Sequence, residues 1–235
     1  MNALNWLTSR TAQLSSAQQQ RLEQLPVAAQ LDTTALNQQR MVVVDVETSG
    51  LDVKRDELLA IGAVVIENGA IDLAQHFECT LLRENHKVSA SVLIHGLAPS
   101  AIAAGAEPAD ALLDFMEFLG NSPLLAFHAS FDQRMLSRAL KQSLGYQLQH
   151  SFFDIANLAP LLCPDASLER AGLDDWIRHF GLQVQQRHNA SADALVTAEL
   201  GLILLSKARQ QQLDSLLALQ QRLNQWSRRP RKHSL

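Results

Sequence analysis

The sequence predicts an α/β fold in which a mixed five-stranded sheet is flanked by helices. Two observations lead to this prediction. The core begins with three apolar segments joined by short turns, which is typical of antiparallel strands. Short apolar segments then alternate with segments of helical periodicity, which indicates strands covered by helices. We therefore expect three antiparallel strands followed by two parallel strands.

The first three strands are predicted from apolar runs and one hairpin signal. Residues 41–47 form an apolar run that ends in acids, and residues 57–67 form a second apolar run. Asn68-Gly69 is the strongest short signal for a hairpin, and it joins the second run to a third strand at residues 70–82. Because these connections are short, neighbouring strands should be antiparallel.

The remainder of the core alternates between strands and helices. Short strands are predicted at residues 124–128 and 151–153. Apolar residues recur with a helical period in five segments, residues 108–119, 131–144, 155–162, 168–180 and 190–207. A last amphipathic helix carries the apolar residues from Leu213 to Trp226.

The chain is expected to hold one core domain with an extension at each end. It has 235 residues, 47% of them hydrophobic, which is enough for one sizeable core. We expect an N-terminal helical arm at residues 1–40, where Pro26 ends a helix. The core domain covers residues 41–207, and a C-terminal helix with a basic tail covers residues 208–235. The arm could dock a protein partner or support a homodimer.

Composition narrows the class of protein. The 24 acids and 20 bases give a formal charge of −4, which is not typical of a general nucleic-acid binder. An enzyme that acts on nucleic acid is still compatible, because metal ions in an acidic pocket can meet the phosphates. Cys79 and Cys163 lack metal-ligand spacing, so we expect two buried thiols. Without a signal peptide or a membrane-length apolar run, a cytoplasmic protein with no membrane contact is expected.

Three short patterns place acids and histidines at the ends of predicted elements. Asp45 and Glu47 close the first strand two positions apart, so their side chains share one face. Two such carboxylates repel each other unless a cation lies between them, and Mg²⁺ takes oxygen ligands. The second pattern, residues 128–132, joins a strand to a helix, and the third, residues 188–193, joins a loop to a helix. Sites in open α/β sheets form at such ends.

In this order the patterns resemble the DEDDh family of 3′–5′ exonucleases, which has a ribonuclease H-like fold and includes the proofreading subunit of bacterial DNA polymerase III. Residues 44–51 are similar to the family's first motif, Phe131-Asp132 to its second, and His188 with Asp193 to its third. The resemblance covers about residues 41–207. Short acidic strings arise by chance, but three in the family's order form a strong signal.

The resemblance implies a site for two divalent metal ions, Mg²⁺ or Mn²⁺, about 4 Å apart. Asp45, Glu47 and Asp193 would hold the metals directly, and Asp132 would act on the second metal, directly or through water. One ion would activate water for attack on the last phosphodiester, and the other would stabilise the leaving 3′ oxygen. His188 would be the general base, because an imidazole titrates near neutral pH.

The resemblance also implies which residues bind the terminal nucleotide. Thr48 and Leu51 would contact it, Leu51 by packing against a base, and Phe131 belongs to the same set. His95, in the segment 94–97, resembles a residue that helps to seat the nucleotide, although a packed structural histidine explains it equally well. His128 stands where the family often has Asn, and because histidine can also donate a hydrogen bond, we expect it to be tolerated.

Several of these acids also have a structural explanation. Asp132 could cap a helix, and Asp193 could stabilise a first helical turn through the helix dipole. Asp154 is expected to be a helix cap, and Asp174 and Asp175 are expected to be solvated. Only the combination of the three patterns favours a catalytic explanation for Asp132.

The resemblance implies an enzyme that releases nucleoside 5′-monophosphates from a nucleic acid with a free 3′ end, DNA in preference to RNA, at single-stranded or frayed ends. One alternative is an enzyme that trims the 3′ ends of RNA or oligoribonucleotides. The other is a non-catalytic nucleotide-binding or scaffold module on the same fold. The complete set of four acids and His188 argues against the module, because a degenerate site would be expected to lose at least one.

Overall fold

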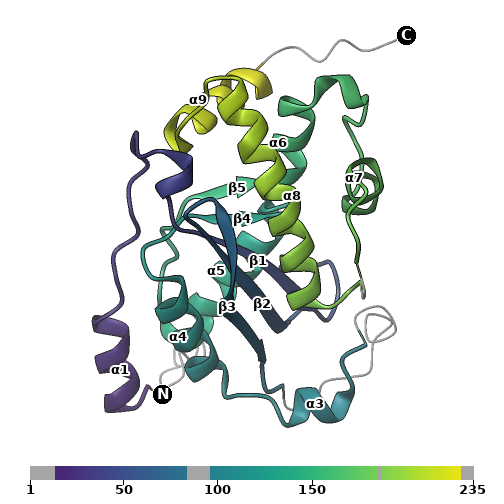
Figure 1. The fold of residues 1–235 in the computed structure, drawn as a ribbon. Helices are drawn as coiled ribbons and strands as arrows, with labels where there is room; N and C mark the ends of the chain where they lie inside the picture. The colour runs from purple at the N-terminus through teal and green to yellow at the C-terminus, as the bar shows by residue number, and fades with distance from the viewer. Residues whose placement is uncertain (1–13, 84–95, 185–186, 229–235) are drawn as a thin grey trace.

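The computed structural model describes residues 14–83, 96–184 and 187–228, and it contains the predicted mixed sheet. The strand order is β3-β2-β1-β4-β5 (Figure 1). β1 pairs antiparallel with β2 and β2 with β3, whereas β4 pairs parallel with both β1 and β5. The strands are β1 (Met41–Thr48), β2 (Leu58–Glu67), β3 (Ala70–Thr80), β4 (Leu124–Ala126) and β5 (Phe152–Asp154).

The central strands are buried because their residues are apolar on both faces. Met41 and Val43 of β1 belong to one core cluster, and Val42 and Val44 belong to another on the opposite face. The hairpin between β2 and β3 has positive φ at both Asn68-Gly69 residues, 53° and 72°, as a type I′ turn requires. The predicted hairpin is therefore confirmed.

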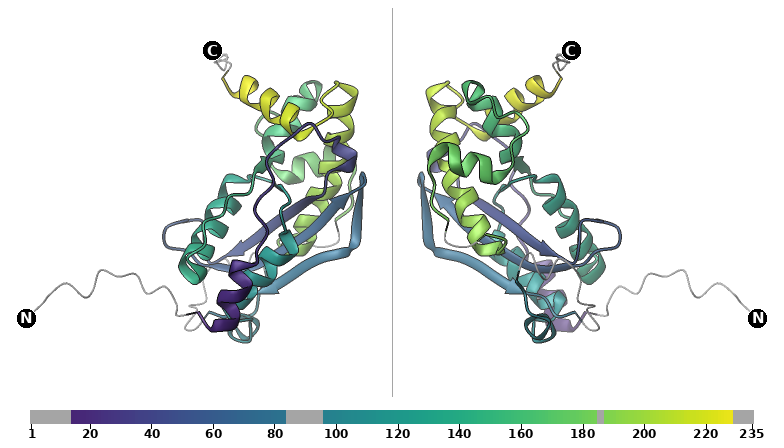
Figure 2. Two further views of the ribbon diagram at one scale, coloured as in Figure 1. Left: turned by 90° about the vertical axis from the view of Figure 1, so that its left-hand side faces the viewer. Right: turned by 90° about the vertical axis from the view of Figure 1, so that its right-hand side faces the viewer.

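Helices cover both faces of the sheet (Figure 2). One face carries α4 (Pro108–Leu119) and α5 (Ser130–Leu144), which contribute to the cluster containing Val42. The other face carries α6 (Ile155–Leu162), α7 (Leu173–Phe180), α8 (Ala190–Gln210) and α9 (Leu216–Ser227). A short helix that we did not predict, α3 (Pro99–Ala103), follows β3, and 3-10 turns occupy Leu36–Gln38 and Pro164–Ala166. Among the described helices, none combines the length and the apolar character that crossing a membrane requires.

The prediction of a helix at residues 168–180 was too long. Ser167 has a left-handed backbone with φ of 54°, and α7 begins only after Gly172. The N–H of Gly172 donates to the Asp175 carboxylate at 2.9 Å, which fixes the start of the helix there. The side chain of Asp175, expected to be solvated, is 39% exposed and accepts this bond as well.

The described part of the N-terminal arm is attached to the core. α1 (Ser16–Glu23) ends before Pro26 and lies beside α4 (Figure 1). The chain after α1 then follows the domain surface, where the N–H of Ala29 donates to Asn121 at 3.0 Å and that of Leu36 to Asp214 at 2.8 Å. A partner-docking or dimerising role for the arm stays a prediction.

The two cysteines are free thiols, as their spacing predicted. Cys163 is buried, whereas Cys79 on β3 is only half-buried, which differs from the expectation that both are buried. β3 lies at an edge of the sheet, so one side of the strand has no neighbouring strand to cover its residues.

Candidate active site

β1 sets the direction of the first two acids. Met41 and Val43 face the side of the sheet covered by α8, and side chains two apart on a strand share a face. Asp45 and Glu47 continue that row toward the end of β1 and are partly buried. The apolar run thus carries two carboxylates under the beginning of α8.

Gly62 allows α8 to approach these acids. It pairs with Asp45 across β1 and β2. A Cβ atom built on Gly62 would lie 2.2 Å from the carbonyl carbon of Ala190 and 2.3 Å from the nitrogen of Ser191. Real Cβ atoms do not make such contacts, so only glycine lets the first turn of α8 rest on the sheet.

Asp193 reaches the cluster from the first turn of α8. The N-cap of α8 is Asn189, whose side chain accepts a hydrogen bond from Ala192, and Asp193 lies in the first turn, where its charge also suits the helix dipole. The side chain of Asp193 is buried, and its Oδ2 accepts a hydrogen bond from the His188 N–H at 3.1 Å. Its Oδ1 forms a short ion pair with Arg187.

Asp132 reaches the same region from α5. The N-cap of that helix is Ala129, with no side-chain cap, so the explanation of Asp132 as a cap is wrong. Asp132 is only 4% exposed, and the backbone N–H of Val46 on β1 donates to its carboxylate. This bond ties the second motif to the strand that carries the first.

Burial and neighbouring negative charges raise the pKa values of three of these carboxylates, Asp45, Glu47 and Asp132. Burial, followed by the charges of Asp132, Asp193 and Glu47, raises the pKa of Asp45 well above its ordinary value. Burial and the charge of Asp193 raise the pKa of Glu47 to about 7. For Asp132, burial is again the largest cause, and its pKa rises to about 8. Arg187 partly offsets the repulsion at Asp45 and Glu47.

The chemistry of this cluster fits a hard divalent cation. Four carboxylates supply the oxygen ligands that Mg²⁺ and Mn²⁺ take, and the raised pKa values of Asp45, Glu47 and Asp132 indicate a shortage of positive charge. Among residues 14–83, 96–184 and 187–228, however, no three acidic, histidine or cysteine side chains are already gathered into a complete metal-binding set. Asp193 is engaged by Arg187 instead, so binding a metal requires a local rearrangement.

His188 and His128 both have the left-handed backbone conformation, with φ of 60° and 61°. This conformation is uncommon for residues other than glycine and costs on the order of 1 kcal/mol or more, so it is typical of functional sites. Both residues are exposed. The N–H of His128 donates to Asp154 Oδ1 at 3.0 Å, whereas that of His188 is held by Asp193. The predicted base therefore lies at the rim of the acid cluster.

The loop at residues 49–57, between β1 and β2, is held in place by hydrogen bonds. The Thr48 hydroxyl donates to the carbonyl of Gly50 at 2.8 Å, and Arg138 donates to the carbonyls of Val53 and Asp56 at 2.7 and 2.8 Å. The loop holds Leu51 in solvent, 86% exposed. An exposed leucine on a braced loop is compatible with packing against a base.

Three other residues were predicted to contact the nucleotide: Phe131, His128 and His95. Phe131 is partly buried and packs against the apolar core under α4 and α5. The bond from His128 to Asp154 is made by the backbone N–H of His128 and not by its imidazole. His95 lies outside the described residues.

Sequence reasoning missed three participants. Gly62 left no signal, because a glycine in a strand does not reveal which segment packs on it. Arg187 did leave one, since it is the basic residue directly before His188. Asp174 was expected to be solvated; its side chain is 65% exposed, but it also accepts a bond from Arg187 at 2.7 Å. Asp154 caps α6, as predicted.

Comparison with known proteins identifies the family. The sequence model of the exonuclease family, RNase_T, matches residues 42–200. The chain is 33% identical over 159 residues to the PolC-type DNA polymerase III of Thermotoga petrophila, covering 67% of this chain and 11% of that protein. It is 28% identical over 186 residues to the PolC-type polymerase of Bacillus subtilis, covering 78% and 13%. The chain thus spans only about a tenth of the length of these relatives.

Solved structures share the fold. Escherichia coli exonuclease I, in a complex with a dT13 oligonucleotide, superposes with a TM-score of 0.62 at 15% identity, covering 74% of this chain and 42% of that chain. Exonuclease X, in a complex with 5′ overhanging duplex DNA, gives a TM-score of 0.57 at 20% identity, covering 72% and 92%. The predicted ribonuclease H-like exonuclease fold is therefore confirmed, and this chain belongs to the RNase_T exonuclease family as a DEDDh-type 3′–5′ exonuclease domain.

Proposed function

We propose that the protein is a divalent-metal-dependent exonuclease that removes nucleoside 5′-monophosphates from the 3′ ends of single-stranded or frayed DNA. The observation that carries the proposal is the approach of four carboxylates from β1, α5 and α8, three of which have pKa values raised by burial and by neighbouring charges. A scaffold module has no reason to keep such repelling charges together, since they lower stability without a cation.

Asp45, Glu47, Asp132 and Asp193 are the proposed metal ligands. Two bound Mg²⁺ or Mn²⁺ ions would supply an activated water and a stabilised leaving 3′ oxygen. The chain's own residues would hold these charges in place: β1 presents two ligands on one face, and Gly62 lets α8 bring the fourth. His188, at the rim of the cluster, would take the proton of the attacking water.

Leu51 and Thr48 are the proposed contacts to the terminal nucleotide. Thr48 fixes the turn through Gly50, and Leu51 offers an apolar surface that a base can cover. An aliphatic side chain can pack against the face of any base, because every base has a flat π-face. This arrangement suits an enzyme that accepts any 3′-terminal base.

DNA is proposed as the substrate because the relatives and the similar solved structures act on DNA or were solved with DNA bound. The matching proteins are DNA polymerases, and the solved structures of the same fold include complexes with oligonucleotides and with duplex DNA. Since this chain spans a small part of the polymerases and shares only the fold with the others, the assignment to DNA rests on analogy. Trimming of RNA ends is the alternative that the experiment must separate.

The test compares a 5′-labelled single-stranded DNA with an RNA of the same sequence, each with Mg²⁺, Mn²⁺ or EDTA. We expect a metal-dependent ladder that shortens from the 3′ end, nucleoside 5′-monophosphate as product, and faster cleavage of DNA. Asp45→Asn and His188→Ala should lower the rate by at least about 100-fold. Faster cleavage of RNA would move the assignment to the RNA alternative.

Two surface variants serve as matched controls. Glu117→Gln removes a carboxylate from α4, and His76→Ala removes an exposed imidazole from β3; both lie outside the acid cluster. Both should cleave at the wild-type rate. If no substrate is cleaved under any metal condition, the catalytic proposal is rejected in favour of the binding module.

A further inference from the structure

Arg187 connects the acid cluster to the protein surface. Its Nη1 pairs with Asp193 Oδ1, and its Nε donates to Asp174 Oδ1 at 2.7 Å. The two carboxylates differ greatly in environment, since the Asp193 side chain is 9% exposed and that of Asp174 is 65% exposed. Arg187 itself is 25% exposed. One guanidinium therefore bridges a buried metal-ligand candidate on α8 and a surface acid in the first turn of α7.

The inner contact occupies a carboxylate oxygen that a metal would need. A guanidinium and a divalent ion carry the same sign, and two like charges on one buried oxygen repel each other strongly. The outer contact does not have this conflict, because Asp174 is not among the proposed ligands and is largely solvated. Arg187 can therefore leave Asp193 and keep its bond to Asp174.

We propose that Arg187 is a displaceable counter-cation, which pairs with Asp193 while the site is metal-free and withdraws to Asp174 when a divalent ion binds. This inference rests on the proposed function, since it assigns Arg187 a role in regulating metal capture at the same site. Arg187 is thus a positioning residue: it limits repulsion among the acids before the metal arrives and competes with the metal for one ligand.

A purely structural role for Arg187 makes the opposite prediction. If Arg187 served only to hold Asp193 in the right place, removing it would misplace a ligand and weaken metal binding. If Arg187 competes with the metal, removing it frees the Asp193 oxygen and leaves the cluster more negative, so metal binding becomes tighter. The sign of the change separates the two explanations.

The test measures Mn²⁺ binding by calorimetry, without nucleic acid, in the full chain. Arg187→Ala should lower the Kd by about tenfold, the change that about 1.4 kcal/mol produces. Asp174→Asn should raise the Kd by about threefold, because Arg187 then has no second partner to which it can withdraw. Arg178→Ala is the matched control: it removes an arginine from an ion pair with Asp175 on the same helix, away from the cluster, and should leave the Kd unchanged.

The double variant Arg187→Ala with Asp174→Asn isolates the coupling. Once Arg187 is gone, Asp174→Asn should have no further effect on the Kd, whereas two independent effects would add. The metal-free melting temperature of Arg187→Ala should fall, because the acids lose their cation, and Mn²⁺ should restore it.

Three results would overturn the inference. If the wild-type protein binds Mn²⁺ and Arg187→Ala has an unchanged or higher Kd, the counter-cation role is rejected and the proposed function is left intact. Additive effects in the double variant reject the withdrawal to Asp174. Failure of the wild-type protein to bind Mn²⁺ at all rejects the metal-dependent function and this inference together.

Discussion

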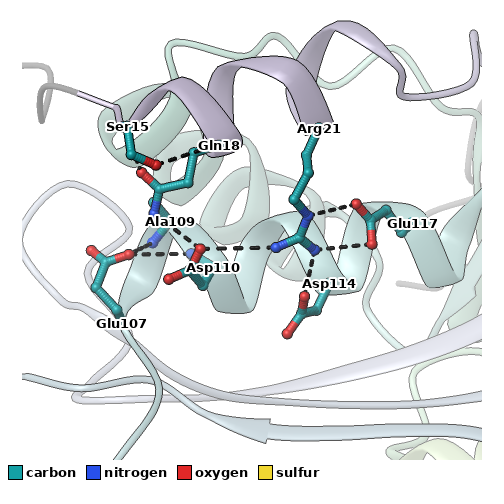
Figure 3. A network of polar contacts seen from close by, with 8 residues as sticks. All are labelled: Ser15, Gln18, Arg21, Glu107, Ala109, Asp110, Asp114 and Glu117. Carbon is teal, nitrogen blue, oxygen red and sulfur yellow. Dashed lines mark hydrogen bonds and ion pairs between the residues drawn. The ribbon is translucent and has the colours of Figure 1, made fainter.

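Two clusters in this protein are built from the same parts, several carboxylates around one arginine, but the pKa of Glu117 in one is lowered, whereas the pKa values of Asp45 and Glu47 in the other are raised. On the surface, Arg21 of α1 meets Asp114 and Glu117 of α4 at 2.5 and 2.7 Å (Figure 3). These acids are about half exposed, and the hydrogen bond from Arg21 lowers the pKa of Glu117. At the end of β1, Arg187 faces acids whose pKa values are raised.

Burial explains the difference. Glu117 keeps its hydration and gains a cation, so its charged form is favoured. The acids around Asp45 lose hydration, and Arg187 divides its bonds between Asp193 of the cluster and Asp174 outside it. Buried acids that are short of positive charge are therefore the stronger indication of a metal site.

The largest effect on the buried acid cluster is expected from moving α8 off the sheet. Gly62→Ala places a methyl group where Ala190 and Ser191 now lie, so Asp193 is displaced from the other acids. We expect the exonuclease rate to fall about 100-fold, as a displacement near 1 Å can produce. Overpacking should also lower the free energy of unfolding by about 1–3 kcal/mol. Oligonucleotide cleavage and urea unfolding measure the two effects.

Gly201→Ala is the matched control for that change. It adds the same methyl group on α8, but its Cβ would meet the Ile66 side chain at 3.6 Å, an ordinary contact. Cleavage should stay at the wild-type rate, and stability should rise slightly because alanine favours a helix by up to about 1 kcal/mol over glycine. Full activity of Gly62→Ala would refute the role of this close approach.

A smaller effect is expected from pH. Because the pKa of Glu47 is raised to about 7 and that of Asp132 to about 8, the folded protein holds more protons than the unfolded chain between their ordinary and raised values. Stability from these groups is therefore greatest at low pH and is lost as pH rises through 7 to 8. In EDTA, the melting temperature should fall by about 3–6 °C between pH 6.5 and 9.

Repeating the pH series with Mg²⁺ tests whether the cation removes this pH dependence of the melting temperature. The ion compensates the repulsion, so the fall in melting temperature should be much smaller with saturating Mg²⁺. The interval begins at pH 6.5 because burial lowers the pKa of His150, which alters stability only at lower pH. A metal-free melting temperature that does not fall as the pH rises would contradict the assignment of raised pKa values to the cluster.

The smallest effect is expected at the surface cluster. Arg21→Ala removes the ion pairs to Asp114 and Glu117, which are solvated and screened. We expect the free energy of unfolding to fall by about 1 kcal/mol or less and cleavage to be unchanged, since exposed ion pairs contribute little. Chemical denaturation with a parallel cleavage assay tests this. A loss of cleavage would indicate that α1 supports the active site and would contradict the independence of the two clusters.

Much of the fold was predictable because periodicity and turn chemistry are local. The apolar run of β1 and the Asn68-Gly69 turn each determine their element with little help from the remaining chain. The helix at 168–180 was overestimated because the apolar spacing continues through Gly172, whereas the helix start depends on a bond to Asp175. Such a bond has no signature in the hydrophobic pattern.

The candidate site was predictable only in part. The four acids and His188 could be selected because each belongs to a motif of fixed spacing. The contacts of Arg187 with Asp174 and of Gly62 with α8 join segments that are distant in sequence and depend on the packed structure. The left-handed backbone at His128 was missed for the same reason: the bond from its N–H to Asp154 comes from the neighbouring strand.

The most direct measurement compares Asp45→Asn with Glu117→Gln in thermal unfolding, first in EDTA and then with Mn²⁺. Without metal, Asp45→Asn should raise the melting temperature because a repelled buried charge is removed, and Glu117→Gln should lower it slightly. Saturating Mn²⁺ should raise the melting temperature of wild type and Glu117→Gln by about 5–10 °C and leave Asp45→Asn nearly unchanged. Equal stabilisation of both variants by Mn²⁺ would contradict a metal site at the end of β1.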